Sequence, residues 1–289
     1  MNQVYLNDTF VPESEARVSV LDHGYLYGDG IFETLRAYSG FIFRLQDHLV
    51  RLFDSARGLS LTLPWDREQL ASILTACLKV NGYDNAVLRL TISRGMGPPG
   101  LDPDLCKTPT LVVLTRPFTG YPEMLYERGI SLALVKVQKN LPQAIDPQIK
   151  SANYLNNILA KIEAKKAGAD EAILLNHQGY LTEGTVSNLF FVNQGKLCTP
   201  SLDAGILDGV TRRLVLEIAG DLGAHVVEGL HTPEALLQAE EAFMTNTTYE
   251  VMPVSRINQQ PLNTGPLSSR LRAEFKRRVA MEKEAHGPE

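Results

Sequence analysis

The chain has 289 residues, and 44% of them are hydrophobic, which is enough for one large core or two smaller ones. Its 28 basic and 33 acidic residues leave a net charge of −5, which excludes the basic surface of a nucleic-acid-binding protein and a polybasic membrane patch. The three cysteines and six histidines are scattered without ligand spacing, so we expect no metal site and a reducing compartment. No signal-peptide core or membrane-spanning apolar run is found, so a cytoplasmic location is expected.

The first half of the chain is expected to be an α+β unit with mostly antiparallel strands. Asn7-Asp8 and Ser39-Gly40 each separate two apolar runs, as in β-hairpins. Residues 24–30 are expected to form a glycine-punctuated turn. The strands predicted here cover residues 4–6, 10–11, 17–21, 31–38, 41–44, 86–93 and 110–114, and the helices cover residues 46–58 and 66–81.

Residues 116–123 contain Pro117, Gly120 and Pro122 and lack periodicity. They predict a linker between a small N-terminal domain, residues 1–115, and a larger C-terminal domain, residues 124–289, which would carry Lys150. The strands predicted in this second half cover residues 130–137, 171–175, 188–192, 196–199, 224–227, 241–244 and 251–257, and the helices cover residues 209–221, 233–239 and 268–283.

Lys150 lies just before a segment with apolar residues at helical spacing, and this junction is the centre of the functional interpretation. Tyr154, Leu155, Ile158, Leu159 and Ile162 predict a helix that packs by one face. A lysine held at such a junction, with its aliphatic part desolvated, becomes a usable amine nucleophile. Most lysines before a helix are solvated surface groups, so the interpretation depends on other residues.

A lysine that binds pyridoxal phosphate requires an acid for the ring nitrogen and donors for the phosphate. Glu183 lies among small residues between two predicted strands, and Arg51 lies on an early helix. Residues 205–212 form a glycine-bounded loop that opens a helix, which suits an anion, and residues 245–248 are rich in hydroxyl groups. Taken singly, each of these features also fits an ordinary turn, helix start or solvated side chain.

In combination and in this order, six motifs resemble the fold-type IV pyridoxal-phosphate enzymes, the class IV aminotransferases. The resemblance extends from about residue 4 to residue 257. It rests on residues 27–34, 48–52, 150–155, 183–190, 206–212 and 245–254.

The resemblance implies an α+β fold with a small N-terminal α/β domain, a larger C-terminal domain with a pseudo-barrel of strands, and pyridoxal 5'-phosphate between them. It implies that Lys150 forms the internal aldimine and moves a proton, and that Glu183 pairs with the pyridine nitrogen. The remaining implied cofactor contacts are Arg51, Val210, Thr211 and Thr247 at the phosphate and Tyr154 near the ring hydroxyl. Family members line their substrate pocket at the positions of Tyr27, Phe32, Arg89 and Thr248, and they form at least homodimers.

The sequence indicates the family more clearly than it indicates which activity of the family this protein has. Branched-chain enzymes commonly carry Tyr-x-Arg where this chain has Val87-Leu88-Arg89, and the Ser93–Gly100 loop lacks the histidine of D-amino acid aminotransferases. We expect an aminotransferase that moves an amino group from an apolar, branched-chain type L-amino acid to 2-oxoglutarate or another 2-oxo acid. The alternatives are an aminodeoxychorismate lyase that releases pyruvate and 4-aminobenzoate, and an (R)-selective amine or D-amino acid transaminase.

Overall fold

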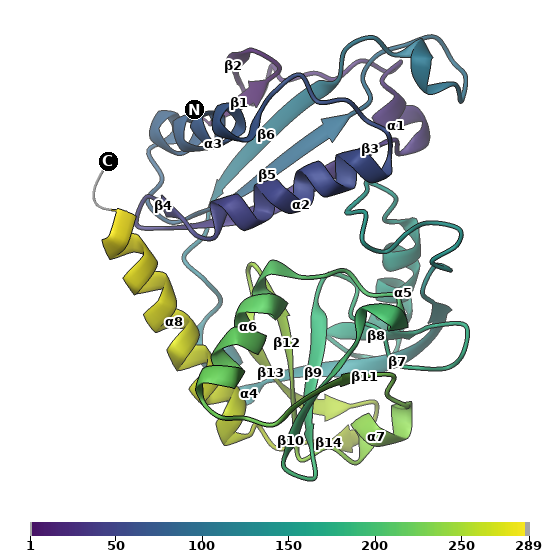
Figure 1. The fold of residues 1–289 in the computed structure, drawn as a ribbon, viewed down its shortest axis with the longest axis vertical. Helices are drawn as coiled ribbons and strands as arrows, with labels where there is room; N and C mark the ends of the chain where they lie inside the picture. The colour runs from purple at the N-terminus through teal and green to yellow at the C-terminus, as the bar shows by residue number, and fades with distance from the viewer. Residues whose placement is uncertain (1, 287–289) are drawn as a thin grey trace. The chain divides into compact units, whose positions relative to one another are not determined.

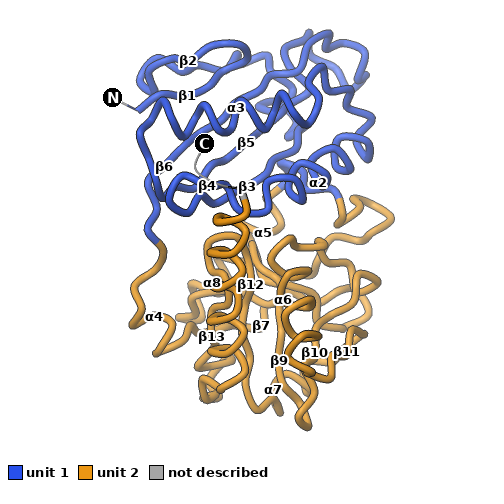
Figure 2. Tube along the Cα trace, turned by 60° about the vertical axis from the view of Figure 1, so that its left-hand side comes forward, with its two compact units in different colours: residues 1–119, 149–153 blue, residues 120–148, 154–289 orange. Residues whose placement is uncertain are grey.

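The computed structural model of the protein describes residues 2–286, which divide into two compact units (Figure 2). Unit 1 contains the residues up to Thr119 together with Ile149–Asn153. Unit 2 contains Gly120–Gln148 and the residues from Tyr154 onward. The α+β fold class expected from the sequence is confirmed, since both units combine helices with a sheet.

Unit 1 is built on an antiparallel sheet with the strand order β2-β1-β6-β5-β3-β4 in the described residues (Figure 1). Its strands are β1 (Gln3–Leu6), β2 (Thr9–Pro12), β3 (Gly30–Tyr38), β4 (Phe41–Ile42), β5 (Ala86–Ser93) and β6 (Thr110–Pro117). Its helices are α1 (His23–Tyr27), α2 (Leu45–Gly58) and α3 (Arg67–Asn81), with a short 3₁₀ turn at Pro103–Leu105.

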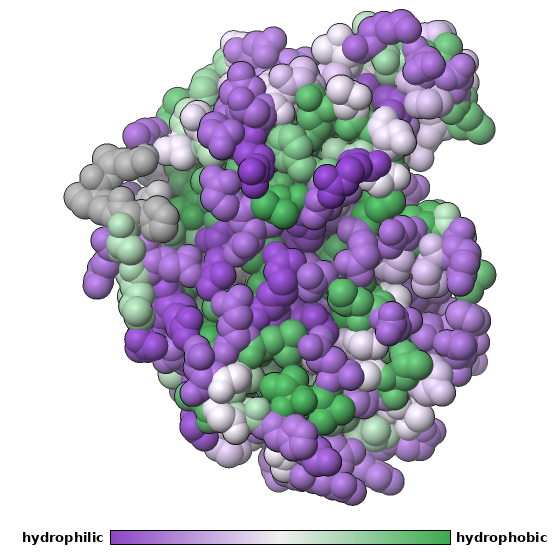
Figure 3. All heavy atoms as spheres, viewed as in Figure 1, coloured by the Kyte–Doolittle hydropathy of each residue, from purple (hydrophilic) through white to green (hydrophobic). Residues whose placement is uncertain are grey.

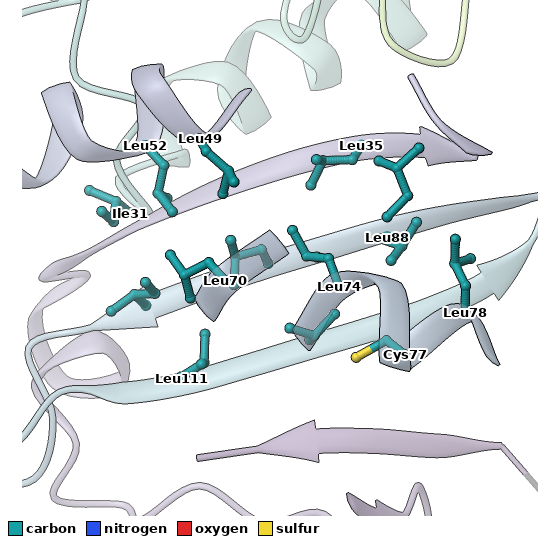
Figure 4. Close-up of a cluster of buried hydrophobic side chains, with 14 of the residues drawn as sticks. Ile31, Leu35, Leu49, Leu52, Leu70, Leu74, Cys77, Leu78, Leu88 and Leu111 are labelled. Atoms are coloured by element: carbon teal, nitrogen blue, oxygen red, sulfur yellow. The ribbon is translucent and has the colours of Figure 1, made fainter. Parts of the chain in front are cut away.

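Leucines of α2 and α3 pack against the strands to form the core of unit 1 (Figure 4). Leu35 on β3, Leu49 on α2, Leu74 on α3 and Leu88 on β5 are all fully buried. Each such side chain contributes about 1.5–3 kcal/mol of hydrophobic free energy. Helix α3 begins at a capping box, in which the Asp66 carboxylate accepts from the Gln69 N–H and the Gln69 side chain accepts from the Asp66 N–H.

The segment Ile149–Asn153 belongs to unit 1, whereas the sequence analysis placed Lys150 in the C-terminal domain. The reason is hydrogen bonding to the start of β3. The Lys150 carbonyl accepts from the Phe32 N–H at 3.0 Å, and the Ala152 N–H donates to the Gly30 carbonyl at 2.8 Å. The Lys150 N–H donates to Ser55 Oγ on α2 at 3.0 Å. Lys150 is therefore held through its backbone by β3 and by Ser55 of α2.

Unit 2 contains a mixed sheet with the order β11-β10-β9-β12-β13-β7-β8, and β14 pairs with β13 in the described residues. The β11–β10, β13–β7 and β7–β8 pairs are parallel, and the other pairs are antiparallel. The strands are β7 (Ile130–Gln138), β8 (Glu171–Leu175), β9 (Asn188–Asn193), β10 (Lys196–Pro200), β11 (Val226–Gly229), β12 (Glu241–Asn246), β13 (Glu250–Ile257) and β14 (Gln260–Pro261). The helices are α4 (Glu123–Arg128), α5 (Leu155–Lys166), α6 (Val210–Asp221), α7 (Pro233–Leu237) and α8 (Pro266–His286), with a 3₁₀ turn at Leu202–Ala204.

Helix α5 packs by a different face from the one expected. The predicted apolar stripe is exposed, with Leu155, Ile158, Leu159 and Ile162 at 68%, 53%, 47% and 44% exposure. The small residues Ala160 and Ala164 are fully buried instead, in a cluster with residues of β7 and β8. The periodicity of apolar residues predicts that a helix has an apolar face, but it does not predict what that face packs against.

Two local predictions were wrong. The stretch 17–21 forms no strand, and Val18, Val20 and Leu21 are exposed. The expected turn at 24–30 contains helix α1, because the Asp22 carboxylate accepts from the Gly24 N–H at its start and Gly28 ends it with φ 70°.

Hydrophilic and hydrophobic residues are interspersed over the face of the molecule drawn in Figure 3. Within residues 2–286, helices that combine the length and the apolar character needed to cross a membrane are absent.

Candidate functional site

In unit 1, three of the residues singled out from the sequence meet at the ring of Phe32. Lys150 Nζ lies 4.7 Å from the centroid of this ring, and the Arg89 guanidinium carbon lies 3.8 Å from it. Phe32 is 4% exposed, so both cations contact a buried aromatic ring. Cations are attracted to aromatic faces at this range. The structure thus places the predicted nucleophile and two predicted substrate residues side by side.

Arg51, on helix α2 of the same unit, is held by an acid of its own. Its Nε donates to Glu33 Oε1 at 2.7 Å and its Nη2 donates to Glu33 Oε2 at 2.8 Å, a bidentate pair that fixes the plane of the guanidinium. His48 Nδ1 lies 2.8 Å from Glu33 Oε2. Glu33 is fully buried on β3 and was given no role from the sequence. The available signal was a glutamate next to the apolar residues Ile31 and Phe32 in a predicted strand.

The charges of this cluster are set by its burial and by Arg51. Burial opposes ionisation of Glu33, but the Arg51 guanidinium and the His48 ring outweigh it and hold the pKa of Glu33 well below its usual range. Burial also lowers the pKa of His48, against the attraction of Glu33. The carboxylate is therefore ionised and paired with Arg51, and the His48 ring lies within hydrogen-bond distance of it.

We expect Glu33→Gln to lower the free energy of unfolding by about 3–5 kcal/mol at pH 7, because the buried Arg51 guanidinium would lose the charge of its carboxylate partner. A depressed pKa stabilises the fold above the unfolded carboxyl value of 4.5, and this contribution is lost as the pH falls through the folded value. The difference between the two proteins should therefore be constant near neutral pH and shrink below about pH 4.5. Denaturant unfolding at several pH values measures the loss of stability at pH 7 and its change with pH.

The matched control is Glu15→Gln, which removes an exposed carboxylate of the same unit and should change stability by less than about 0.5 kcal/mol. Equal stabilities of the Glu33→Gln variant and the parent protein would show that the buried pair contributes nothing.

In unit 2, Glu183 is connected to the segment that opens helix α6. Glu183 Oε2 accepts from the Leu207 N–H and from Asn188 Nδ2, both at 3.1 Å, and Asn188 Nδ2 also donates to the Leu207 carbonyl. Glu183 Oε1 accepts from Lys139 Nζ at 2.5 Å. Glu183 is buried, with 6% of the whole residue exposed. The predicted acid and the predicted glycine-bounded loop are thus joined by hydrogen bonds. Lys139, which also contacts the acid, was not identified from the sequence.

Val210 and Thr211 are the first residues of α6, where helix N–H groups lack partners in the preceding turn. Gly209 precedes them, and a Cβ there would lie 2.1 Å from Asn188 Oδ1, so the close approach needs glycine. Backbone N–H groups and the helix dipole at such a start favour an anion.

Thr247 and Thr248 lie in the turn between β12 and β13. Asn246 Oδ1 organises this turn by accepting from the N–H of Thr248 and of Tyr249 at 2.9 and 2.6 Å, and from Thr248 Oγ1 at 3.1 Å. Nearby on β12, the buried Thr245 Oγ1 has no hydrogen-bond partner. These hydroxyl groups match the donors that a phosphate requires.

The two tyrosines singled out from the sequence lie in different units. Tyr27 is the last residue of α1, and its hydroxyl accepts from the Gly100 N–H at 2.9 Å, so it is tied to the loop between β5 and β6. Tyr154 directly precedes α5 in unit 2.

The residues present fit pyridoxal phosphate by their chemistry: an amine, a buried carboxylate, a helix N-terminus, hydroxyl groups and an oriented arginine. Groups of three or more metal-ligating side chains are absent from the part of the chain that the structure describes.

Comparison with known proteins gives a consistent result. Residues 30–257 match the family model described as "Amino-transferase class IV". A "Putative branched-chain-amino-acid aminotransferase" of Methanocaldococcus jannaschii is 42% identical over 277 residues, which are 95% of this chain and 95% of that protein. An "Aminodeoxychorismate lyase" of Bacillus subtilis is 34% identical over 280 residues, 96% of this chain and 94% of that protein.

The fold comparison agrees. The crystal structure of a branched-chain aminotransferase from the thermophilic archaeon Thermoproteus uzoniensis with norvaline superposes with a TM-score of 0.92 and 34% sequence identity. The match covers 98% of this chain and 96% of that one.

Proposed function

The chain belongs to the class IV aminotransferases, and on this premise we propose that it transfers the amino group of an apolar, branched-chain type L-amino acid to 2-oxoglutarate or another 2-oxo acid. The observation that carries the proposal is the connection between Glu183 and the start of α6 through the Leu207 N–H. The proposed partner of the ring nitrogen and the proposed phosphate site would then belong to one hydrogen-bonded structure, as pyridoxal phosphate requires.

The proposed cofactor residues are those singled out from the sequence. Lys150 would attach the cofactor covalently, Glu183 would contact its ring nitrogen, and Tyr154 would lie near its ring hydroxyl. The phosphate would be bound by Arg51, Val210, Thr211 and Thr247. When bound, the cofactor supplies an electron sink for the negative charge that develops at the substrate α-carbon.

The side chains of this protein supply the proton movements and the orientation. The Lys150 amine would take the proton from the substrate α-carbon and return it on the cofactor side. The Glu183 carboxylate would keep a proton on the ring nitrogen, which strengthens the electron sink. Glu33 would hold the Arg51 guanidinium in its binding orientation through the bidentate pair.

The substrate pocket is proposed to involve Tyr27, Phe32, Arg89 and Thr248. The proposed role of Phe32 is supported by its contacts with both Lys150 and Arg89. The preference for branched-chain amino acids is supported by the named activity of the 42% identical relative and of the superposed structure. The lyase of Bacillus subtilis supports release of pyruvate from aminodeoxychorismate as the second candidate activity.

The two candidates are separated by titrating the purified, cofactor-loaded protein with single amino donors and recording the visible spectrum. L-leucine or L-glutamate should bleach the band of the lysine-bound cofactor, and 2-oxoglutarate should restore it. Pyruvate release from aminodeoxychorismate without net bleaching would favour the lyase instead. Bleaching by D-alanine or (R)-1-phenylethylamine alone would assign one of the other transaminase specificities. A protein that binds no added cofactor would overturn the proposal.

We also propose that the protein is a cytoplasmic homodimer. The cysteines Cys77, Cys106 and Cys198 are free, which suits a reducing compartment. The exposed stripe of α5, formed by Leu155, Ile158, Leu159 and Ile162, presents apolar side chains to water in the single chain. Such a continuous apolar face supports contact with a second copy.

Leu159→Glu is expected to shift the protein from dimer to monomer, because a charge in the centre of an apolar interface costs several kcal/mol when it is buried without a partner. Size-exclusion chromatography with light scattering measures the mass. Lys196→Glu, at an exposed lysine on β10, should leave the mass unchanged. A Leu159→Glu protein with the mass of the parent would place the contact elsewhere.

A further inference from the structure

The carboxylate proposed to contact the cofactor ring already has a cation of its own. Lys139 Nζ donates to Glu183 Oε1 at 2.5 Å, and the two side chains are only 13% and 8% exposed. Lys139 directly follows β7, and its N–H donates to the Leu175 carbonyl at the end of β8. The lysine is thus anchored by the sheet rather than carried by a mobile surface segment.

The two oxygens of Glu183 differ in the charge of their partners. Oε2 receives two neutral donors, the Leu207 N–H and Asn188 Nδ2. Oε1 accepts a hydrogen bond from the charged side chain of Lys139, which lies within ion-pair distance of this carboxylate. A buried carboxylate without a cation nearby is strongly unfavourable, so Lys139 compensates the charge of Glu183 whether or not a cofactor is bound.

A protonated ring nitrogen would be a second cation at the same carboxylate. Because Oε2 already accepts two hydrogen bonds, the ring N–H would share Oε1 with Lys139. Two cations at one oxygen repel each other, and the repulsion is large where solvent is excluded.

We propose that Lys139 is a positioning residue that acts as the resident counter-ion of Glu183 and competes with the cofactor ring nitrogen for Oε1. This inference rests on the proposed contact between Glu183 and the ring. Lys139 balances the charge of the carboxylate and orients it before the cofactor arrives. It also limits the affinity for the ring afterwards, which allows the cofactor to exchange.

The experiment compares Lys139→Met, which keeps the length and removes the charge, with Lys139→Arg, which keeps the charge. Lys136→Met is the matched control, because Lys136 is an exposed lysine on the preceding strand β7. Pyridoxamine 5'-phosphate is the probe, since its binding forms no covalent bond with Lys150. Its Kd is measured by calorimetry, and the Tm of each protein is measured without and with saturating probe.

Lys139→Met is expected to lower the Tm of the probe-free protein by roughly 5–10 °C, because Glu183 loses its cation. With saturating probe the loss should be clearly smaller, since the ring nitrogen then supplies a cation. By linkage, the Kd for the probe should fall about tenfold. Lys139→Arg should restore both values, and Lys136→Met should change neither.

A double-variant cycle links the effect to Glu183. When Glu183→Gln is already present, adding Lys139→Met should cause no further tightening of probe binding. If Lys139→Met instead weakens binding, or lowers the Tm equally with and without probe, Lys139 serves the fold alone and the inference is overturned. If Glu183→Gln binds the probe and absorbs light as the parent does, the proposed ring contact of Glu183 fails first, which separates the two failures.

Discussion

Replacing Lys150 with alanine is expected to abolish transamination and the visible absorbance of the lysine-bound cofactor. The Lys150 amine is the proposed point of covalent attachment and the proposed carrier of the α-proton. Its backbone is held by bonds to Phe32 and Ser55 that do not involve the side chain, so the variant should fold. Turnover is measured with L-leucine and 2-oxoglutarate, and absorbance is measured on the purified protein.

The control for this prediction is Lys166→Ala, which removes an exposed lysine from the end of α5 and should leave both properties intact. Cofactor retained without covalent attachment is compatible with the prediction, because the phosphate contacts remain. Normal turnover by the Lys150→Ala protein would show that another amine carries the reaction.

Replacing Glu183 with glutamine is expected to lower turnover by on the order of 10³-fold or more while the cofactor still binds. A neutral amide does not hold a proton on the ring nitrogen, so the charge that develops at the α-carbon is delocalised less effectively. Single-turnover kinetics with L-leucine isolate the proton-transfer step, and equilibrium titration with the cofactor measures its affinity.

Glu234→Gln serves as the control, because this carboxylate is exposed on α7 and should not affect either measurement. A Glu183→Gln protein with unchanged kinetics would mean that a different group contacts the ring nitrogen. Loss of cofactor binding together with loss of fold would point to a structural role through the Leu207 and Asn188 contacts.

Much of the fold follows from local rules that the sequence displays directly. The hairpins at Asn7-Asp8 and Ser39-Gly40 form as expected, since turn residues there separate short apolar strands. Helices α2 and α3 lie within one residue of their predicted bounds, because apolar periodicity and the capping residue Asp66 are local signals. The stretch 17–21 failed, because β-branched residues without a partner strand do not make a strand.

The family and its candidate residues were likewise accessible without coordinates, because they depend on the order and identity of short motifs. The class IV match and the relatives confirm that family. The roles of single residues and the homodimer stay predictions that the experiments above address, and the domain boundaries also stay predictions.

What depended on the tertiary structure is every pairing between residues far apart in the chain. Local periodicity does not reveal that Glu33 meets Arg51, that Lys139 meets Glu183, or that Lys150 joins the sheet of unit 1. The apolar stripe of α5 was visible in the sequence, but only the packing of Ala160 and Ala164 revealed that it remains exposed. The physical reason is common to these cases: a residue's own chemistry determines what kind of partner it needs, whereas the path of the chain determines which partner it meets.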